Sequence, residues 1–238
     1  MTHHVHRTRY FRIFILRLIG NYLILVSLFF IVKTFYDPVV SELRYYFDTF
    51  VIRKEYVVVS DKYEPIPVNK QRTASKSQLA SFFNIPQVET ISPIDPDFSI
   101  VIPKIAANAR VLGNVNPADE AEYLEKLRYG VAHAAGTYLP GQDGHIFLFA
   151  HSTDYVWNIS TYNAIFYLLY KLDDGDEVNV FFQGKRHVYV VTGKKVVEPS
   201  DVQYLTNKTD SEFLTLQTCW PPGTTLKRLL VFAKPKVE

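Results

Sequence analysis

Three side chains with the chemistry of a nucleophile, an acid–base group and a fixed cation stand where predicted strands begin or end. Cys219, the only cysteine, ends the run 212–219 and precedes a Pro-Pro-Gly turn. His151 follows the apolar run 145–150 and opens a polar loop. A thiolate nucleophile needs a neighbour that activates it and an acid that protonates the leaving group, and histidine does both. Two strands that end at one rim of a barrel would bring Cys219 and His151 together.

Arg228 follows Cys219 by nine residues and begins the last apolar run of the chain. An antiparallel return over the intervening turn would place its guanidinium near the sulfur. Because arginine does not lose its proton, it would act electrostatically on the thiolate, on a substrate carbonyl or on a developing oxyanion. The alternatives are an arginine on a solvated strand edge and a cysteine that is simply a small buried apolar side chain.

The other histidines of the C-terminal part favour structural roles. His133, a rival base, precedes a Gly-Thr turn, and His145 and His187 lie in predicted strands. A metal site needs three or four converging ligands, and separated histidines without paired spacing do not predict one. No metal or other cofactor is therefore expected. The acidic segment 173–177 favours a polar turn before a strand. A loop calcium site is the alternative there, with the carboxylates of Asp173, Asp174, Asp176 and Glu177.

Composition limits the class of protein. The chain has 238 residues, of which 47% are hydrophobic and 21% charged, so it is neither disordered nor collagen-like and is long enough to bury a substantial core. A net charge of +2 does not suggest a nucleic-acid-binding protein. The single cysteine excludes an internal disulfide and any multi-cysteine zinc or iron–sulfur site.

An apolar segment, 13–32, follows a basic tail, 1–12, and the chain up to Tyr36 has five basic and no acidic residues. As a helix at about 1.5 Å per residue, the segment covers a bilayer core of roughly 30 Å. Most of the basic residues precede or open it, so the positive-inside rule keeps the N-terminus in the cytoplasm and the rest outside. We expect an uncleaved single-pass membrane anchor. A cleaved signal peptide and a buried helix of a soluble domain are the alternatives.

The chain after the anchor divides into two parts. In 33–90, Asp37-Pro38 indicates a helix start, the spacing of Val39, Leu43, Phe47 and Phe50 predicts an amphipathic helix, and the polar stretch 60–89 predicts a linker. In 91–238, short β-branched and aromatic runs between turns predict a mainly β fold, a closed barrel with short helices. Strands are predicted over 98–102, 145–150, 177–182, 187–192, 212–218 and 229–233, a hairpin turn at 183–185, and helices around 118–127 and 163–172.

The residues 215–219, Thr-Leu-Gln-Thr-Cys, resemble the T-L-x-T-C signature of the sortases, the cysteine transpeptidases of bacterial cell surfaces. Residues 150–152 stand at the family's histidine motif, and 219–228 resemble the stretch that leads to its arginine. The segments 130–137 and 100–105 resemble a family G-V-x-H-x-x-G-T segment and the opening strand. Two departures are Ala150, where glycine is common, and Trp220, which adds an aromatic surface beside the nucleophile.

The resemblance implies a mechanism and a set of partners. Cys219 would attack an L-P-x-T-G-like sorting motif bound in a groove on the barrel, and His151 would protonate the departing amine. Thr218, backbone N–H groups and Arg228 would hold the substrate or the oxyanion, beside Ala150 and Trp220. An amine of peptidoglycan or of another protein would then resolve the thioacyl enzyme. The expected partners are surface proteins with a C-terminal sorting motif, the amine acceptor and membrane lipid, and no nucleic acid.

Two other functions stay open on the sequence. One is a catalytically silent, sortase-like binding module tethered to the membrane, and the presence of Cys219, His151 and Arg228 together argues against it. The other is a structural envelope protein whose one cysteine is buried and inert to alkylation.

Overall fold

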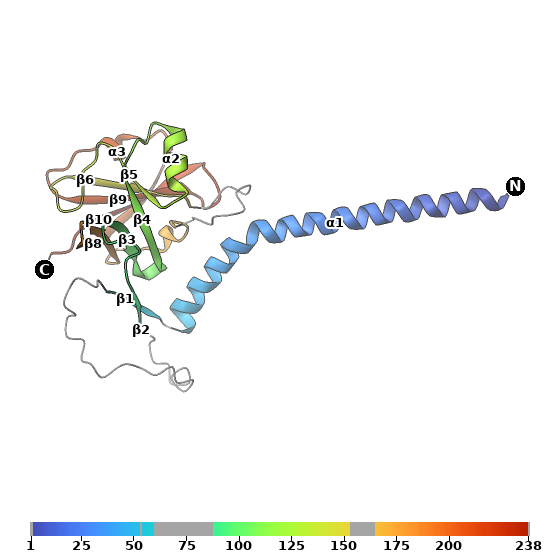
Figure 1. Ribbon diagram of the computed structural model, residues 1–238, viewed down its shortest axis with the longest axis horizontal. Helices are drawn as coiled ribbons and strands as arrows, with labels where there is room; N and C mark the ends of the chain where they lie inside the picture. Colours follow the sequence, from blue (N-terminus) through green and yellow to red (C-terminus); the bar gives the residue numbers. More distant parts are fainter. Residues whose placement is uncertain (1, 53, 60–87, 153–164, 238) are drawn as a thin grey trace. The chain divides into compact units, whose positions relative to one another are not determined.

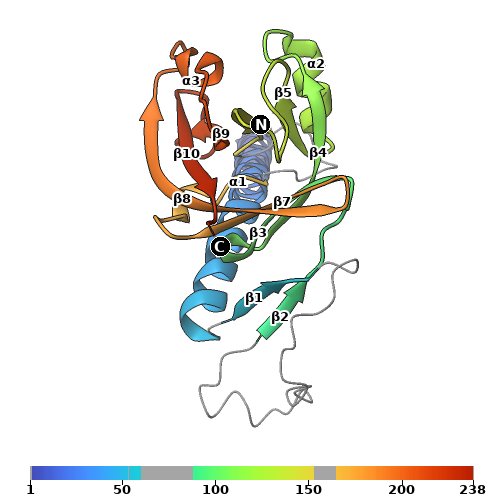
Figure 2. The same ribbon diagram turned by 90° about the vertical axis from the view of Figure 1, so that its left-hand side faces the viewer.

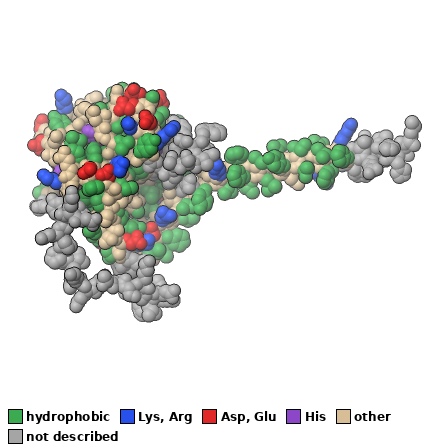
Figure 3. Space-filling view, in the orientation of Figure 1, with side chains coloured by type: hydrophobic (Ala, Val, Ile, Leu, Met, Phe, Trp, Pro, Cys, Tyr) green, Lys and Arg blue, Asp and Glu red, His purple; other side chains and the backbone are tan. Residues whose placement is uncertain are grey.

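The apolar N-terminal segment belongs to one helix, α1 (Thr2–Tyr46), in the computed structural model of the chain (Figure 1). The structure describes residues 2–52, 54–59, 88–152 and 165–237. Within α1, the stretch Phe11–Tyr36 is long and apolar enough to cross a membrane, and its most apolar window is not buried at all. Hydrophobic side chains cover this stretch in Figure 3. This exposure argues against the buried helix of a soluble domain and fits a helix surrounded by lipid.

The predicted helix start at Asp37-Pro38 is wrong, because α1 runs through Pro38 to Tyr46 and continues as a π-helical turn, Phe47–Val51. The φ angle of proline matches that of an α-helix, so the helix continues at the cost of a backbone hydrogen bond. The predicted apolar stripe lies on this continuous helix and its π-turn. Its four members each expose about half of their surface or more: Val39, Leu43, Phe47 and Phe50.

A closed barrel forms the centre of the second of the chain's two units, which runs from Arg44 to Glu238. Around the barrel the strand order is β10-β8-β7-β3-β4-β5-β6-β9. Figure 2 shows β8, β9 and β10 on one side, β4 and β5 on the other, and β3 and β7 crossing between them. The strands are β3 (Phe98–Ile102), β4 (Ala107–Val115), β5 (Val131–Ala134), β6 (His145–Phe149), β7 (Glu177–Phe182), β8 (Lys185–Val197), β9 (Phe213–Trp220) and β10 (Lys227–Pro235). The predicted mainly β, closed barrel is confirmed.

The strand predictions succeed where a run of apolar residues ends at turn residues. Strands β3 and β7 have the predicted bounds, and the other four predicted runs lie within or overlap β6, β8, β9 and β10. The β7–β8 hairpin turns at Gln183 and Gly184, whose φ angles of 50° and 74° are those of a type I′ turn. Strands β4 and β5 were not predicted, because small and polar residues interrupt their apolar pattern.

The helices around the barrel are short. Helix α2 (Glu120–Leu127) confirms one prediction and begins at Asp119, whose side chain accepts the N–H of Glu122 at 3.1 Å. The predicted helix at 163–172 is wrong in its described part, which forms turns and a 3₁₀ helix, Leu169–Lys171. Its apolar residues pack into the barrel instead of lying along one helical face. Two unpredicted helices are a 3₁₀ turn, Pro103–Ile105, and α3 (Gln203–Thr206).

Two short strands pair in parallel outside the barrel, β1 (Glu55–Val58) and β2 (Val88–Ile91). Val58 packs with Val101 and Phe181 of the barrel, and Arg186 Nη1 donates to the Val58 carbonyl at 3.2 Å. The predicted linker lies outside the described residues except at its end, where 88–89 belong to β2. Residues before 91 therefore support the barrel.

Side chains of the barrel strands point alternately inward and outward, as the pleat requires. On the strands that matter for the site, the inward ones are buried in the main core: Ile146, Leu148, Leu214, Leu216, Leu229 and Val231. The residues between them contribute to a second cluster on the outer face, with Leu127 of α2: Phe147, Phe149 and Leu230. Each fully buried aliphatic side chain contributes about 1.5–3 kcal/mol, so this alternation fixes the register of the strands.

Gly130, just before β5, tests the close packing of β4 on β5. A Cβ there would lie 2.2 Å from the carbonyl oxygen of Arg110, and backbone cannot yield as a side-chain end does. Gly130→Ala should therefore lower the free energy of unfolding by about 1–3 kcal/mol, measured by denaturant titration of the full chain in detergent. Gly113→Ala in β4 is the matched control, since its Cβ comes no closer than 3.8 Å to Phe98. Equal stabilities of the two variants would contradict the prediction.

Candidate active site

Cys219 lies on the outer face of the barrel, one residue before the end of β9. The side chains of Leu214 and Leu216 belong to the interior core, and Thr218 is buried, so the alternation turns Cys219 outward. The thiol is free and half-buried. A nucleophile in this place is shielded on the barrel side and open to a substrate on the other.

Arg228 is the direct antiparallel partner of Cys219 in the β9–β10 ladder. The predicted return of the chain over the turn is thereby confirmed, and the two side chains share the outer face. Directly opposed residues have Cβ atoms about 4.5–5.5 Å apart. The guanidinium Nη1 donates to the carbonyls of Thr225 and Lys227, each at 3.1 Å. These bonds hold the cation beside the turn that follows Cys219.

His151 reaches the same rim through the parallel pairing of β6 with β9. Phe149 pairs with Gln217, and Ala150 N–H donates to the Gln217 carbonyl at 3.1 Å. Continuing this register by two residues places His151 beside Cys219. The alternation that buries Leu148 and Ala150 in the core turns His151 outward, where it is partly exposed. The structure thus brings Cys219 of β9, Arg228 of β10 and His151, two residues after the end of β6, to one rim.

Burial and a neighbouring charge shift the pKa of the Cys219 thiol in opposite directions. Burial raises the pKa of Cys219, and the positive charge of Arg228 opposes that rise with the smaller effect. The net pKa lies above its ordinary value, which favours a protonated thiol at rest. A reaction at neutral pH therefore needs a base to take the proton, and His151 is the side chain at the rim that can do so.

Thr218 and Ala150 join the ends of the two strands. The Thr218 hydroxyl points inward and donates to the Ala150 carbonyl at 2.9 Å, and both residues are buried. The Thr218 hydroxyl is thus engaged with the end of β6, and the expected role of Thr218 at a substrate or an oxyanion stays a prediction. Donors for an oxyanion at this rim would be backbone N–H groups and the guanidinium of Arg228.

Trp220 is partly buried and packs against the main core, and its expected role as an aromatic surface beside the site stays a prediction. Its ring packs on the main core and lies 5.5 Å from the ring of Tyr170, between centroids. The reason is again the alternation, since Trp220 and Cys219 are neighbours on one strand and must face opposite ways. Trp220 supports the end of β9 from inside the barrel.

His133 has both ring nitrogens occupied. Nδ1 accepts the N–H of Asn114 at 3.3 Å, so the proton of the neutral ring sits on Nε2, which lies 2.9 Å from the Tyr138 carbonyl oxygen. Burial lowers the pKa of His133. A buried, neutral ring that links β4 to the turn after β5 fits the structural role predicted for it.

His145 and His187 also lie away from Cys219. His145, at the start of β6, places Nδ1 3.1 Å from the Asn207 carbonyl oxygen and Nε2 2.8 Å from Thr215 Oγ1, and burial lowers its pKa. Burial likewise lowers the pKa of His187 in β8, while the charge of Glu212 opposes the shift. Since β6 and β9 run in parallel, the start of β6 lies at the opposite rim from the thiol.

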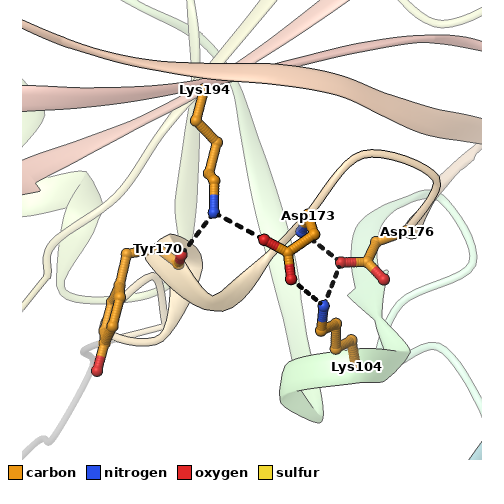
Figure 4. A network of polar contacts seen from close by, with 5 residues as sticks. All are labelled: Lys104, Tyr170, Asp173, Asp176 and Lys194. Atoms are coloured by element: carbon orange, nitrogen blue, oxygen red, sulfur yellow. Dashed lines mark hydrogen bonds and ion pairs between the residues drawn. The ribbon is translucent and has the colours of Figure 1, made fainter.

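The acidic segment considered for calcium is held by lysines (Figure 4). Lys104 Nζ lies 2.9 Å from Asp173 and 2.7 Å from Asp176, and Lys194 Nζ lies 3.2 Å from Asp173. Hydrogen bonds from these lysines lower the pKa of the Asp173 carboxyl. Among the described residues, no three His, Cys, Asp or Glu side chains are grouped as metal ligands. The network supports the reading of this segment as a polar turn.

Comparisons with known proteins agree on one family. The family model described as Sortase domain matches residues 100–236, which include His151, Cys219 and Arg228. Sortase D of Bacillus subtilis (strain 168) is 26% identical over 184 residues, which cover 76% of this chain and 81% of that protein. The structure of Sortase C1 of GBS Pilus Island 1 matches with a TM-score of 0.50 and 28% identity over 59% of this chain, but over only 64% of its own. A Streptococcus agalactiae Sortase C1 structure matches with the same TM-score and identity, over 67% of its chain.

The positive charge of Arg228 should change the rate at which the Cys219 thiol is alkylated. Arg228→Gln removes the effect that opposes burial, so the pKa of Cys219 rises further and the thiolate fraction at neutral pH falls. Alkylation by iodoacetamide, followed by intact mass, should slow about three- to tenfold at neutral pH. The control is Arg228→Lys, which keeps the charge and should stay within about twofold of wild type in this assay. A wild-type rate in Arg228→Gln would contradict the assignment.

The buried histidines predict that the folded chain loses stability as the pH falls. Folding lowers the pKa values of His133, His145 and His187 below 6.5, so near that pH the unfolded chain binds more protons than the folded one. Stability is then fully present above about pH 6.5 and is lost as the pH falls toward the folded-state values. Melting temperatures measured from neutral to mildly acidic pH should fall, and His187→Gln, the least buried site, should reduce the fall. Parallel profiles of His187→Gln and wild type would show that His187 does not contribute.

Proposed function

Because the chain belongs to the sortase family, we propose that it is a membrane-anchored cysteine transpeptidase with Cys219 as its nucleophile. Members of this family are typically cell-wall transpeptidases that act on surface proteins bearing sorting signals. The observation that carries the proposal is the pair of strand registers that sets Cys219 against Arg228 and, through β6, beside His151. Three side chains with complementary chemistry share one rim and one face.

The first step of the proposed reaction forms a thioester. His151 takes the proton of the Cys219 thiol, and the sulfur attacks the carbonyl carbon of the threonine in an L-P-x-T-G-like motif. The electron pair of the C=O bond moves to oxygen, where backbone N–H groups and Arg228 stabilise the negative charge. When the intermediate collapses, the C–N bond to the next residue breaks, and His151 returns the proton to the departing amine.

The second step transfers the acyl group to an amine. A primary amine of peptidoglycan or of another surface protein attacks the thioester carbon and gives up a proton to His151. The C–S bond breaks, an amide bond forms, and the proton returns to Cys219 as a thiol. Neither step needs a metal ion or an oxidant. Water can replace the amine, in which case the product is a free carboxylate.

The proposed location follows from α1. The stretch Phe11–Tyr36 is apolar enough to span a bilayer, and its basic N-terminal flank favours a cytoplasmic N-terminus. The barrel would then lie outside the cytoplasm, where sorting signals and wall amines are available. The stretch carries few charges, and its length of 26 residues leaves room for tilt.

The alternative of a catalytically silent binding module makes a different use of the same barrel. It needs no thiol, no base and no fixed cation at the rim, so the joint placement of Cys219, His151 and Arg228 favours the enzyme. A structural protein with an inert cysteine is disfavoured because the thiol is only half-buried and lies on the outer face.

Thioester formation provides the test. The full chain in detergent is incubated with a pool of L-P-x-T-G-like peptides, and its intact mass is recorded. We expect an added acyl mass that a small amine removes, because the thioester is more reactive than the amide from which it forms. Cys219→Ala should show no adduct and an unchanged melting temperature, since the side chain is only half-buried. An adduct of equal yield on Cys219→Ala would reject Cys219 as the nucleophile. If wild type gives no adduct and its thiol resists alkylation, the silent module is favoured.

A further inference from the structure

The segment 165–172 closes the end of the barrel at which β9 finishes, and we refer to it as the plug. It precedes the turn at Asp173. Its side chains pack into the main core from that end, three of them without any exposed surface: Phe166, Leu169 and Leu172. Ile165, Leu168 and Tyr170 are partly buried against the same core. The plug is therefore part of the barrel's packing and not a surface loop.

The plug contacts His151 after the end of β6 and the last residue of β9. The N–H of Phe166 donates to the carbonyl of His151 at 3.3 Å. The ring of Tyr170 lies 5.5 Å from the ring of Trp220 at an interplanar angle of 56°. Trp220 directly follows Cys219, and its inward ring packs the last residue of β9 against the main core. A movement of the plug would change the positions of His151 and Cys219 together.

Two lysines fix the plug at its C-terminal end (Figure 4). Lys194 Nζ donates to the Tyr170 carbonyl at 2.9 Å and to Asp173 at 3.2 Å. Lys104 Nζ bonds Asp173 and Asp176, the carboxylates that follow the plug. In Figure 4 the Tyr170 carbonyl faces Lys194 while its ring points away from the network. The backbone of Tyr170 is thus held from one side, and its ring is left to contact Trp220.

Lys171 connects the plug with the end of helix α1. Its ammonium lies 4.8 Å from the centroid of the Tyr170 ring and 5.2 Å from that of Tyr45, distances typical of cation–π contacts. Tyr45 is the penultimate residue of α1, lies in the same unit as the barrel and is partly buried on the main core. A continuous series of contacts therefore runs from the helix end to the residue after the nucleophile.

We propose that Tyr170 is a positioning residue for Cys219 and that Lys171 couples it to Tyr45 at the end of α1. Aromatic pairs and cation–π pairs have preferred geometries, so each contact restricts the next ring. Trp220 transmits the restriction to β9, because its backbone is covalently continuous with Cys219. Small displacements of a nucleophile from its base cost large factors in rate. The segment that leaves the proposed membrane span would in this way help to set the geometry of the reaction.

The experiment uses the full chain in detergent and has a readout that needs no substrate. Because Cys219 is the only thiol, its rate of alkylation at neutral pH reports its environment directly. Tyr170→Leu removes the ring and keeps an apolar side chain, and Tyr170→Phe is the matched control that keeps the ring. We expect Tyr170→Leu to change the alkylation rate by about three- to tenfold and Tyr170→Phe to stay within about twofold.

The coupling to the helix end is tested by a double-mutant cycle. Lys171→Met and Tyr45→Leu should each change the alkylation rate by about two- to threefold. The double variant should equal Lys171→Met, because Lys171→Met already removes the contact that Tyr45→Leu removes. Lys171→Arg retains the cation and should behave as wild type. These residues are only partly buried, so the variants are expected to fold, which melting temperatures check.

The reaction readout rests on the proposed function. In peptide turnover, Tyr170→Leu should lower kcat about tenfold while KM stays within about twofold, because positioning affects the reacting atoms and not peptide binding. Wild-type alkylation rates in Tyr170→Leu, or independent and additive effects of Lys171→Met and Tyr45→Leu, would overturn the proposal. Absence of turnover in wild type would reject the proposed function alone, since the alkylation comparison does not depend on a substrate.

Discussion

The pairing of β9 with a parallel strand on one side and an antiparallel strand on the other is the constraint on which the site depends. Parallel pairing with β6 brings the two carboxyl ends, and so Cys219 and His151, to one rim. Antiparallel pairing with β10 brings the beginning of that strand, and so Arg228, to the end of β9. Because side chains alternate, a shift of one residue in either ladder would turn one member of the set to the wrong face. The register of the strands therefore brings together three side chains that belong to separate segments of the sequence.

The same alternation gives neighbouring residues of β9 different roles, because their side chains face opposite sides of the barrel wall. Cys219 faces outward, whereas Thr218 and Trp220 on either side of it face inward. Thr218 joins β9 to the end of β6 through the Ala150 carbonyl, and Trp220 joins it to the plug through Tyr170. The cost of this support is partial burial of the thiol, which raises its pKa. Arg228 offsets part of that rise, and a base at the rim is needed for the rest, so structure and acid–base chemistry are linked at one residue.

Much of this arrangement follows from the sequence, for identifiable reasons. The runs that form β3 and β7 are strongly apolar and end at turn residues, so their bounds were predictable, and the nine-residue spacing over a Pro-Pro-Gly turn indicated the return of Arg228 to Cys219. The inward direction of Trp220 follows from its position next to Cys219 and could have been read from the alternation. The apolar residues of the plug predict a helix, but their spacing reflects packing into a barrel end that only the fold creates. The contact of Lys171 with Tyr45 joins segments far apart in the chain, and no local pattern signals it.

The most direct test of the central claim is a crystal structure of the chain with a sorting-motif peptide bound covalently to Cys219, for example through an electrophile in place of the scissile carbonyl. The account predicts that the peptide lies on the outer face of the barrel, with the Arg228 guanidinium near the carbonyl oxygen and the His151 ring near the position of the leaving amine. It also predicts that Trp220 stays against Tyr170 inside the barrel end. An adduct whose carbonyl is directed away from both Arg228 and His151 would contradict the proposal that strand register assembles the reacting groups.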